Sequence, residues 1–182
     1  MKIKKLTVSD VDRFKSIRII AVEDFPASFY PTKNELIETS DEDFRTQLTP
    51  SDWSTIFGAF EKDELIGIVG IKRDKRMKVK HKADIWGMYV KQSDRGRGIA
   101  RQLMKSAIDH VAAFPEVIAI TLSVNSGNAA ARSLYVSIGF RPFGLEKNSI
   151  FTNGNFIHEE HMMLDLTSKE GSLEDLQTSK SG

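Results

Sequence analysis

Arginine and glycine alternate in one short segment, residues 95–101 (RGRGIAR), and this combination is suited to binding phosphate. Glycine carries no side chain, so an anionic ligand can approach the backbone of Gly96 and Gly98 closely. The guanidinium groups of the three arginines supply donors that match the geometry of phosphate oxygens. The segment therefore predicts a turn that binds an anion, and close packing of the chain is the alternative explanation for its glycines.

The segments on either side predict where this turn lies. Residues 83–90 are mostly apolar and predict a buried strand, and residues 99–111 place Ile99, Leu103 and Val111 on one helical face. A phosphate at the start of that helix would meet backbone N–H groups without helical partners and the positive end of the helix dipole. Two common nucleotide patterns are not met, because Arg101 stands at the third glycine of GxGxxG and no Walker A pattern is present.

A second segment, residues 128–140 (NAAARSLYVSIGF), predicts an amphipathic helix followed by a glycine stop. Taken together, the two segments resemble the signature of the GCN5-related N-acetyltransferases, the GNAT superfamily. Arg95, Gly98 and Ala100 are similar to the (Q/R)-x-x-G-x-(G/A) motif of that family. Residues 128–140 are similar to its N-x-x-A-x-x-L-Y-x-x-x-G-F segment.

The resemblance extends over residues 1–166 in the order of elements and is sharpest over residues 83–140. It implies that the chain binds acetyl-coenzyme A (acetyl-CoA) as a co-substrate and transfers the acetyl group to a primary amine by direct attack in a ternary complex. It also implies that Tyr135 protonates the leaving thiolate and that Asn128 hydrogen-bonds near the pantetheine or the pyrophosphate. The resemblance implies further cofactor contacts in the strand that pairs with pantetheine and in the turn that holds the pyrophosphate: Met88, Tyr89, Val90, Arg95, Gly96, Arg97, Gly98, Ile99, Ala100 and Arg101.

Neither motif identifies the general base. An alkylammonium has a pKa near ~10.4 and must lose a proton before it attacks, so a positioned carboxylate, or a water relayed to one, is needed. The candidates are Glu23 and Asp24 after the first helix, Asp84 in the central strand, and the adjacent pair Glu159 and Glu160. Each has a structural alternative, namely a solvated helix end, an ion partner of a nearby basic residue, or a structural ion pair. We predict Glu23, Asp84 and Glu160 as catalytic residues beside Tyr135.

The order of elements predicts an α+β fold. Strand patterns cover residues 3–7, 53–61, 65–72, 83–90, 117–124, 140–150 and 155–166. A first helix carries Val11, Phe14, Ile17, Arg18 and Ala21 on one face, and residues 32–48 predict a polar helical segment. We expect a GNAT-like, mixed and mostly antiparallel sheet of about seven strands flanked by about four helices. Residues 1–166 would form one domain, and residues 167–182 a polar, flexible tail.

Composition excludes several classes of function. The chain has no cysteine, so disulfides, thiolate nucleophiles and cysteine-ligated zinc are excluded, and its four histidines do not form a metal-ligand cluster. A net charge of +1 provides no global field for nucleic acid or for an anionic membrane. The N-terminus lacks the apolar stretch of a secretory signal, and no apolar run approaches the ~20 residues that span a bilayer. We therefore expect a cytoplasmic protein without a metal.

Three alternatives stay open from the sequence. A chain with this fold can be a non-catalytic, regulatory module that binds acyl-CoA. The basic residues 72–82 suggest an enzyme that modifies a ribosomal protein, although the segment lacks the aromatic residues that a nucleic-acid surface usually interleaves, and a solvated hairpin explains it as well. Related enzymes are often dimers, so a homodimer is a further alternative.

Overall fold

Seven strands form one sheet in the computed structural model, which describes residues 1–167. They are β1 (Lys2–Lys5), β2 (Ser54–Glu61), β3 (Glu64–Arg73), β4 (Lys82–Val90), β5 (Ala119–Asn125), β6 (Arg141–Thr152) and β7 (Asn155–Asp165). The order is β1-β2-β3-β4-β5-β7-β6, and every neighbouring pair is antiparallel except β4 and β5. The predicted mixed, mostly antiparallel sheet is confirmed. The predicted tail, residues 167–182, lies outside the described residues except for Thr167.

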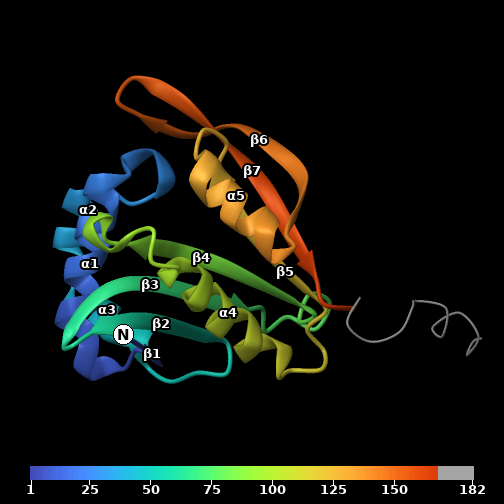
Figure 1. Cartoon of the computed structure of the whole chain (residues 1–182), viewed down its shortest axis with the longest axis horizontal. Helices are drawn as coiled ribbons and strands as arrows, with labels where there is room; N and C mark the ends of the chain where they lie inside the picture. The colour runs from blue at the N-terminus through green and yellow to red at the C-terminus, as the bar shows by residue number, and fades with distance from the viewer. Residues whose placement is uncertain (168–182) are drawn as a thin grey trace, which may run out of the picture.

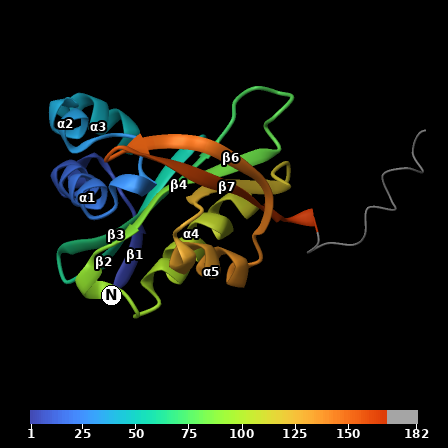
Figure 2. The same ribbon diagram turned by 90° about the horizontal axis from the view of Figure 1, so that it is seen from above.

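Helices cover both faces of the sheet (Figures 1 and 2). In the described part of the chain they are α1 (Val11–Asp24), α2 (Lys33–Glu38), α3 (Asp41–Leu48), α4 (Ile99–Ala112) and α5 (Ala129–Ile138). Helices α1 to α3 enclose one core that includes Phe14 and Phe44, and α4 and α5 enclose a second core that includes Leu103 and Met104. None of these helices has the length and apolar character needed to cross a membrane.

The polar segment 32–48, which the sequence predicts to be helical, forms two short helices. Thr39 has an extended backbone that ends α2, and Ser40 starts α3 because its hydroxyl accepts a hydrogen bond from the Asp43 N–H at 3.1 Å. This break raises the number of α-helices within residues 1–167 to five, against the four or so that the sequence predicts.

Strands β4 and β5 pair over a short distance and then diverge. Their parallel register runs only from Lys82 opposite Ala119 to Asp84 opposite Thr121. Beyond Asp84 the edge of β4 that faces β5 has no strand partner in the described chain. Figure 1 shows the two halves of the sheet meeting at one end and opening toward the other, with α5 beside the opening. These two strands are thus splayed, and the splay leaves backbone groups of β4 available to a ligand.

Candidate active site

A cavity of about 460 Å³ lies between β4, the turn before α4, and helix α5. Sequence reasoning predicted most of its lining as cofactor contacts, and the structure brings these residues together from four separate elements. They are Met88, Tyr89, Val90, Arg95, Gly96, Gly98, Ile99, Ala100, Arg101, Asn128 and Tyr135. We call this space the donor cavity. Arg97 is the one predicted cofactor residue that does not line it.

The glycine turn presents free backbone N–H groups to the donor cavity. Gly96 and Gly98 have φ values of +76° and +74°, a region that favours glycine, and a Cβ placed on either would meet no atom within 4 Å. The helical hydrogen bonds of α4 begin with the N–H of Gln102, which donates to the carbonyl of Gly98 at 3.2 Å. The N–H groups of residues 99–101 therefore have no helical acceptor, and the turn is an open cradle that fits an anion such as a pyrophosphate.

The three arginines of the turn have different roles. Arg95 donates to the carbonyl of Val90 at 3.1 Å and Arg101 donates to the hydroxyl of Ser137 at 2.6 Å, and both line the donor cavity. Arg97 instead pairs with Glu61 at 3.0 Å and with Asp94 at 2.6 Å. The side chain of Arg97 therefore forms ion pairs and does not line the donor cavity, so only its backbone stays a predicted contact with the cofactor.

A bulge in β4 lies beside the donor cavity. Gly87 and Met88 stand opposite a single residue of β3, Val69, because the register shifts between Ile68 and Gly70. Gly87 has a φ of +63°, which favours glycine at this position. The bulge interrupts the regular β3–β4 ladder at Met88, which lines the donor cavity.

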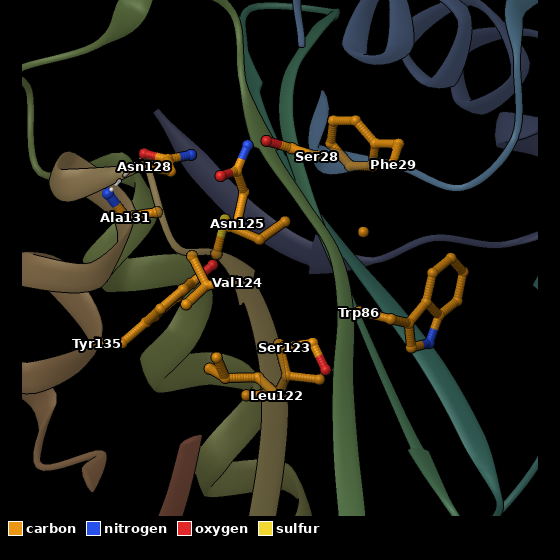
Figure 3. A pocket seen from close by; sticks show the side chains of 13 residues that line it. Ser28, Phe29, Trp86, Leu122, Ser123, Val124, Asn125, Asn128, Ala131 and Tyr135 are labelled. Carbon is orange, nitrogen blue, oxygen red and sulfur yellow. Dashed lines mark hydrogen bonds between the residues drawn. The ribbon is translucent and has the colours of Figure 1, made fainter. Parts of the chain in front are cut away.

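Tyr135 on α5 and Asn128, the residue that precedes this helix, line the donor cavity. Tyr135 is only 6% exposed, and this burial raises the pKa of its phenol to about 12. Within residues 1–167 its hydroxyl has no hydrogen-bond partner, and Figure 3 shows it directed toward β5. The phenol of Tyr135 is therefore protonated at neutral pH and free to donate. Asn128 accepts a hydrogen bond from the Ala131 N–H at 3.1 Å and so starts α5.

A small cavity of about 110 Å³ continues from the donor cavity and passes between β4 and β5 (Figure 3). Met88 and Tyr135 line both spaces, so the two are adjacent. On its other side, Trp86, Gly87 and Ser123 are shared with a third cavity of about 290 Å³, which we call the acceptor cavity. The small cavity is therefore the point where a molecule in the acceptor cavity would meet one in the donor cavity.

The predicted base candidates differ in whether they line one of these three cavities. Asp84 lines the acceptor cavity, where it accepts a hydrogen bond from Thr121 at 3.0 Å and pairs with Lys72 at 3.6 Å. Burial raises the pKa of its carboxyl above the usual range. Glu23 lines none of the three cavities and pairs with Lys33 at 2.5 Å on the surface.

Glu159 and Glu160 are neighbours on β7, and their side chains point to opposite faces of the strand. Glu160 pairs with Arg132 of α5 at 2.8 Å and lines none of the three cavities. Glu159 is 4% exposed, lines the acceptor cavity, and accepts hydrogen bonds from Tyr30 at 2.7 Å and Ser149 at 2.5 Å. The inward-facing member is thus Glu159 and not Glu160, because neighbouring strand residues point to opposite faces.

Sequence reasoning missed a polar chain between β5, β7 and β6. Ser123 lines both the small and the acceptor cavity, and its hydroxyl lies 2.8 Å from His161 Nδ1. His161 Nε2 lies 3.1 Å from Glu146. The three residues meet because Ser123 stands opposite His161 in the β5–β7 register. Only the strand pairing, which no local pattern encodes, could have revealed this chain.

Sequence reasoning also missed Arg18 as a site residue, although a signal was present. Arg18 lies on the apolar face of α1 between Ile17 and Ala21, where a charged side chain is unusual. In the structure it is 8% exposed and lines the acceptor cavity.

Comparisons with known proteins agree with this geometry. The family model for the acetyltransferase (GNAT) family matches residues 14–140. An acetyltransferase of the GNAT family from Streptococcus pneumoniae has a TM-score of 0.80 and 22% identity, over 91% of this chain and 98% of that chain. A ribosomal-protein-alanine N-acetyltransferase from Brucella melitensis has a TM-score of 0.72 and 21% identity, over 91% and 100%. The protein yncA from Salmonella typhimurium, solved with its cofactor acetyl-CoA, has a TM-score of 0.73 and 19% identity, over 94% and 96%.

A comparison with curated proteins found no match. The solved structures establish the shared fold, and the family match, which spans well over half of the chain, establishes the family. The chain belongs to the acetyltransferase (GNAT) family and is an acyl-CoA-dependent N-acetyltransferase.

Proposed function

We propose that the protein transfers the acetyl group of acetyl-CoA to the primary amine of a small molecule, by direct attack while both substrates are bound. The observation that carries this proposal is that the small cavity between β4 and β5 shares lining residues with both the donor and the acceptor cavity. Met88 and Tyr135 line the donor side of that passage, and Ser123 lines the acceptor side. An amine entering from one side therefore reaches a thioester entering from the other without a covalent enzyme intermediate.

The donor half supports binding of the whole coenzyme. The free N–H groups of residues 99–101 would hold the pyrophosphate, with Arg95 and Arg101 adding positive charge. The open edge of β4 beyond Asp84 would pair with the amides of pantetheine as an added strand does. Bound acetyl-CoA supplies an acetyl group activated as a thioester. The backbone N–H of Met88 at the bulge would polarise the thioester carbonyl.

The Ser123–His161–Glu146 chain supports deprotonation of the amine. Glu146 accepts only, so His161 donates its Nε2–H to Glu146 and keeps Nδ1 as the acceptor of the Ser123 hydroxyl proton. A substrate ammonium beside Ser123 would give its proton to the serine oxygen while the serine proton passes to His161. The neutral amine then attacks, and the imidazolium is stabilised by Glu146. Asp84 is the alternative base, but its carboxylate is already held by Thr121 and Lys72.

The two bases are distinguished by matched variants. His161→Gln removes the proton acceptor and should lower kcat by about 10²- to 10⁴-fold, whereas Asp84→Asn should lower it by less than about tenfold. The affinity for acetyl-CoA, measured by calorimetry, should stay unchanged in both variants. The opposite ranking of the two variants would assign the base to Asp84.

Tyr135 would protonate the departing thiolate of coenzyme A. Its hydroxyl is protonated because burial holds the pKa near 12, and it lines both the donor and the small cavity. Glu23 and Glu160 lie outside the cavities and are paired with basic residues, so we assign them no step in the reaction.

The proposal is tested by calorimetry with acetyl-CoA and by a panel of amines. We expect the protein to bind acetyl-CoA, and thiol release from acetyl-CoA to be stimulated by at least one class among amino acids, polyamines, aminoglycosides and N-terminal peptides. Binding of acetyl-CoA without stimulation by any primary amine would contradict acetyl transfer to amines and favour a regulatory module. Absence of acetyl-CoA binding would overturn the donor half of the proposal.

Acetylation of a protein amine is the second candidate, because the structurally similar Brucella melitensis enzyme is a ribosomal-protein-alanine N-acetyltransferase. The basic residues 72–82 between β3 and β4 would be the contact with such a partner. Several of these cations are already neutralised, since Lys72 pairs with Asp84, Arg73 with Glu116 and Arg76 with Asp74. These three ion pairs reduce the positive charge that the segment offers to a protein partner, so we place the small-molecule acceptor first.

A further inference from the structure

One buried cation in the acceptor cavity has no anionic partner. Arg18 extends from the inner face of α1 and is 8% exposed. Within residues 1–167 no carboxylate, carbonyl or hydroxyl accepts a hydrogen bond from its guanidinium group, although the group has five N–H donors. Burial without a counter-charge lowers the pKa of Arg18 to about 10. Buried charges in proteins are ordinarily paired, so this arrangement needs an explanation.

Aromatic rings hold Arg18 in place but leave its donors free. The guanidinium carbon lies 5.7 Å from the centre of the Phe29 ring and 5.6 Å from the centre of the Trp86 ring. Such contacts favour the cation through the faces of the rings, and they do not use the N–H groups in its plane. Arg18 is therefore positioned and desolvated, with its hydrogen-bonding edge unused.

The other charges around the acceptor cavity do not neutralise Arg18. Asp84 pairs with Lys72, and Asp24, at the end of α1, accepts a hydrogen bond from Tyr89 at 2.6 Å. Glu159 is held by two hydroxyl groups, and no cation among residues 1–167 forms an ion pair with it. The cavity thus contains one unpaired guanidinium and one unpaired carboxylate, which are complementary to a ligand that carries both an anion and an ammonium group.

Arg18 also lies close to the site of acetyl transfer. A Cβ placed on Gly87 would be 2.9 Å from Arg18 Nη1, so the guanidinium lies directly over the bulge. Met88, the next residue, lines the small cavity and the donor cavity. An anion bound to Arg18 would therefore be near the thioester, and the reacting amine must be only a few bonds away from that anion.

We propose that Arg18 binds a carboxylate of the acceptor, so that the substrate is an amino acid or a close analogue in which the carboxylate lies near the acetylated amine, while Glu159 attracts the ammonium group that Ser123 then deprotonates. This assignment rests on the proposed amine acetyltransferase function. It narrows the acceptor to a zwitterion and disfavours polyamines, which have no anion for Arg18. Attack by the deprotonated amine forms the amide bond and releases coenzyme A as its thiol.

The test compares free L-amino acids with their carboxamides, which keep the amine and remove the negative charge. Thiol release with acetyl-CoA should give a kcat/KM for the best amino acid about 10- to 100-fold above that of its carboxamide, as expected for charge-assisted hydrogen bonds. Arg18→Met should bring this ratio close to one, and Arg18→Lys should restore part of it. Arg13→Met is the matched control, because Arg13 lies on the same helix, is half exposed and pairs with Asp10, and it should leave the ratio unchanged.

Two further acceptors test the position and the chemical identity of the anion that Arg18 binds. A dipeptide places its carboxylate far from the amine, and phosphoethanolamine replaces the carboxylate by a phosphate. Both should be poorer acceptors than the amino acid, and a preference for phosphoethanolamine would assign the Arg18 subsite to phosphate instead. Equal rates with amino acid and carboxamide in the wild type, or an unchanged ratio in Arg18→Met, would overturn the proposal while leaving amine acetylation intact. A wild type that fails to bind acetyl-CoA would instead contradict the proposed function.

A binding measurement that needs no turnover completes the test. Trp86 contacts Arg18, so its fluorescence in a Trp53→Phe background should change on titration with the best amino acid from the panel, or with glycine if none reacts. The same titration of Arg18→Met should give no saturable change. The melting temperature of Arg18→Met should equal or exceed that of the wild type, because an unpaired buried cation is removed. A marked loss of stability together with unchanged amino-acid binding would show that Arg18 only packs between the two rings.

Discussion

At the scale of single residues, Tyr135 combines burial with an unused hydroxyl. Tyr135 lines the donor cavity, and its ring packs in the core, where its centre lies 6.1 Å from the centre of the Phe140 ring. Tyr135→Phe keeps the ring and removes the proton donor. We expect kcat to fall by about 10²- to 10³-fold, as for loss of a general acid, while calorimetry gives an acetyl-CoA Kd within about twofold of the wild type. Unchanged kcat would remove Tyr135 from the mechanism.

Burial of Tyr135 also predicts a pH dependence of stability. The phenol has a pKa of about 10 in the unfolded chain and of about 12 in the folded chain. Its contribution to stability is therefore complete below pH 10 and is lost as the pH rises from 10 to 12, by about 3 kcal/mol. Urea unfolding of Tyr135→Phe should show a weaker alkaline decline than the wild type. Tyr30 and Tyr89 also have raised pKa values but are present in both proteins, so their effects cancel in the difference.

At the scale of elements, the start of α4 depends on glycine for two separate reasons. Gly98 needs a positive φ, and its open surroundings admit a ligand. Gly154, in the turn between β6 and β7, has a φ of +76° and equally open surroundings but lies outside the three cavities. Gly154→Ala is therefore a matched control for Gly98→Ala.

Both glycine variants should lose about 1 to 2 kcal/mol of unfolding free energy, because alanine is strained in the left-handed region. Only Gly98→Ala should also weaken acetyl-CoA binding, by at least about tenfold, because its Cβ occupies the space where the phosphates approach the backbone. Chemical denaturation and calorimetry measure the two effects separately. Equal loss of acetyl-CoA affinity in both variants, or in neither, would contradict the assignment of the cradle.

The elements also explain which half of the site the sequence reveals. The donor half is built by contiguous segments, so the turn at residues 95–101 and the helix that carries Tyr135 can be recognised from local spacing. The acceptor half joins Arg18 of α1, Trp86 of β4 and Glu159 of β7, which no local pattern connects. The choice between Glu159 and its neighbour depends on how β7 faces the cavity, and the register of its pairing with β6 shifts twice. A sequence alone does not specify such shifts.

At the scale of the whole molecule, the sheet is two halves joined by a short contact. The β4–β5 register covers three residue pairs, and α5 lies beside the opening between the halves (Figure 1). A ligand in the donor cavity would contact β4 on one side and α5 on the other. Bound coenzyme would therefore link the halves, in addition to carrying the acetyl group.

This arrangement predicts that acetyl-CoA stabilises the fold and protects a defined region. At 100 times its Kd the ligand adds about 2.7 kcal/mol, which raises the melting temperature by roughly 5 to 10 °C for a protein of this size. Hydrogen exchange should slow in residues 85–90 of β4, where the edge that faces β5 has no strand partner. It should also slow in the amides of residues 99–101, which have no helical acceptor. Adenosine diphosphate carries the pyrophosphate but no pantetheine, so it should protect residues 99–101 and leave residues 85–90 unchanged. If both ligands protected the two segments equally, pantetheine would not be the group that pairs with β4.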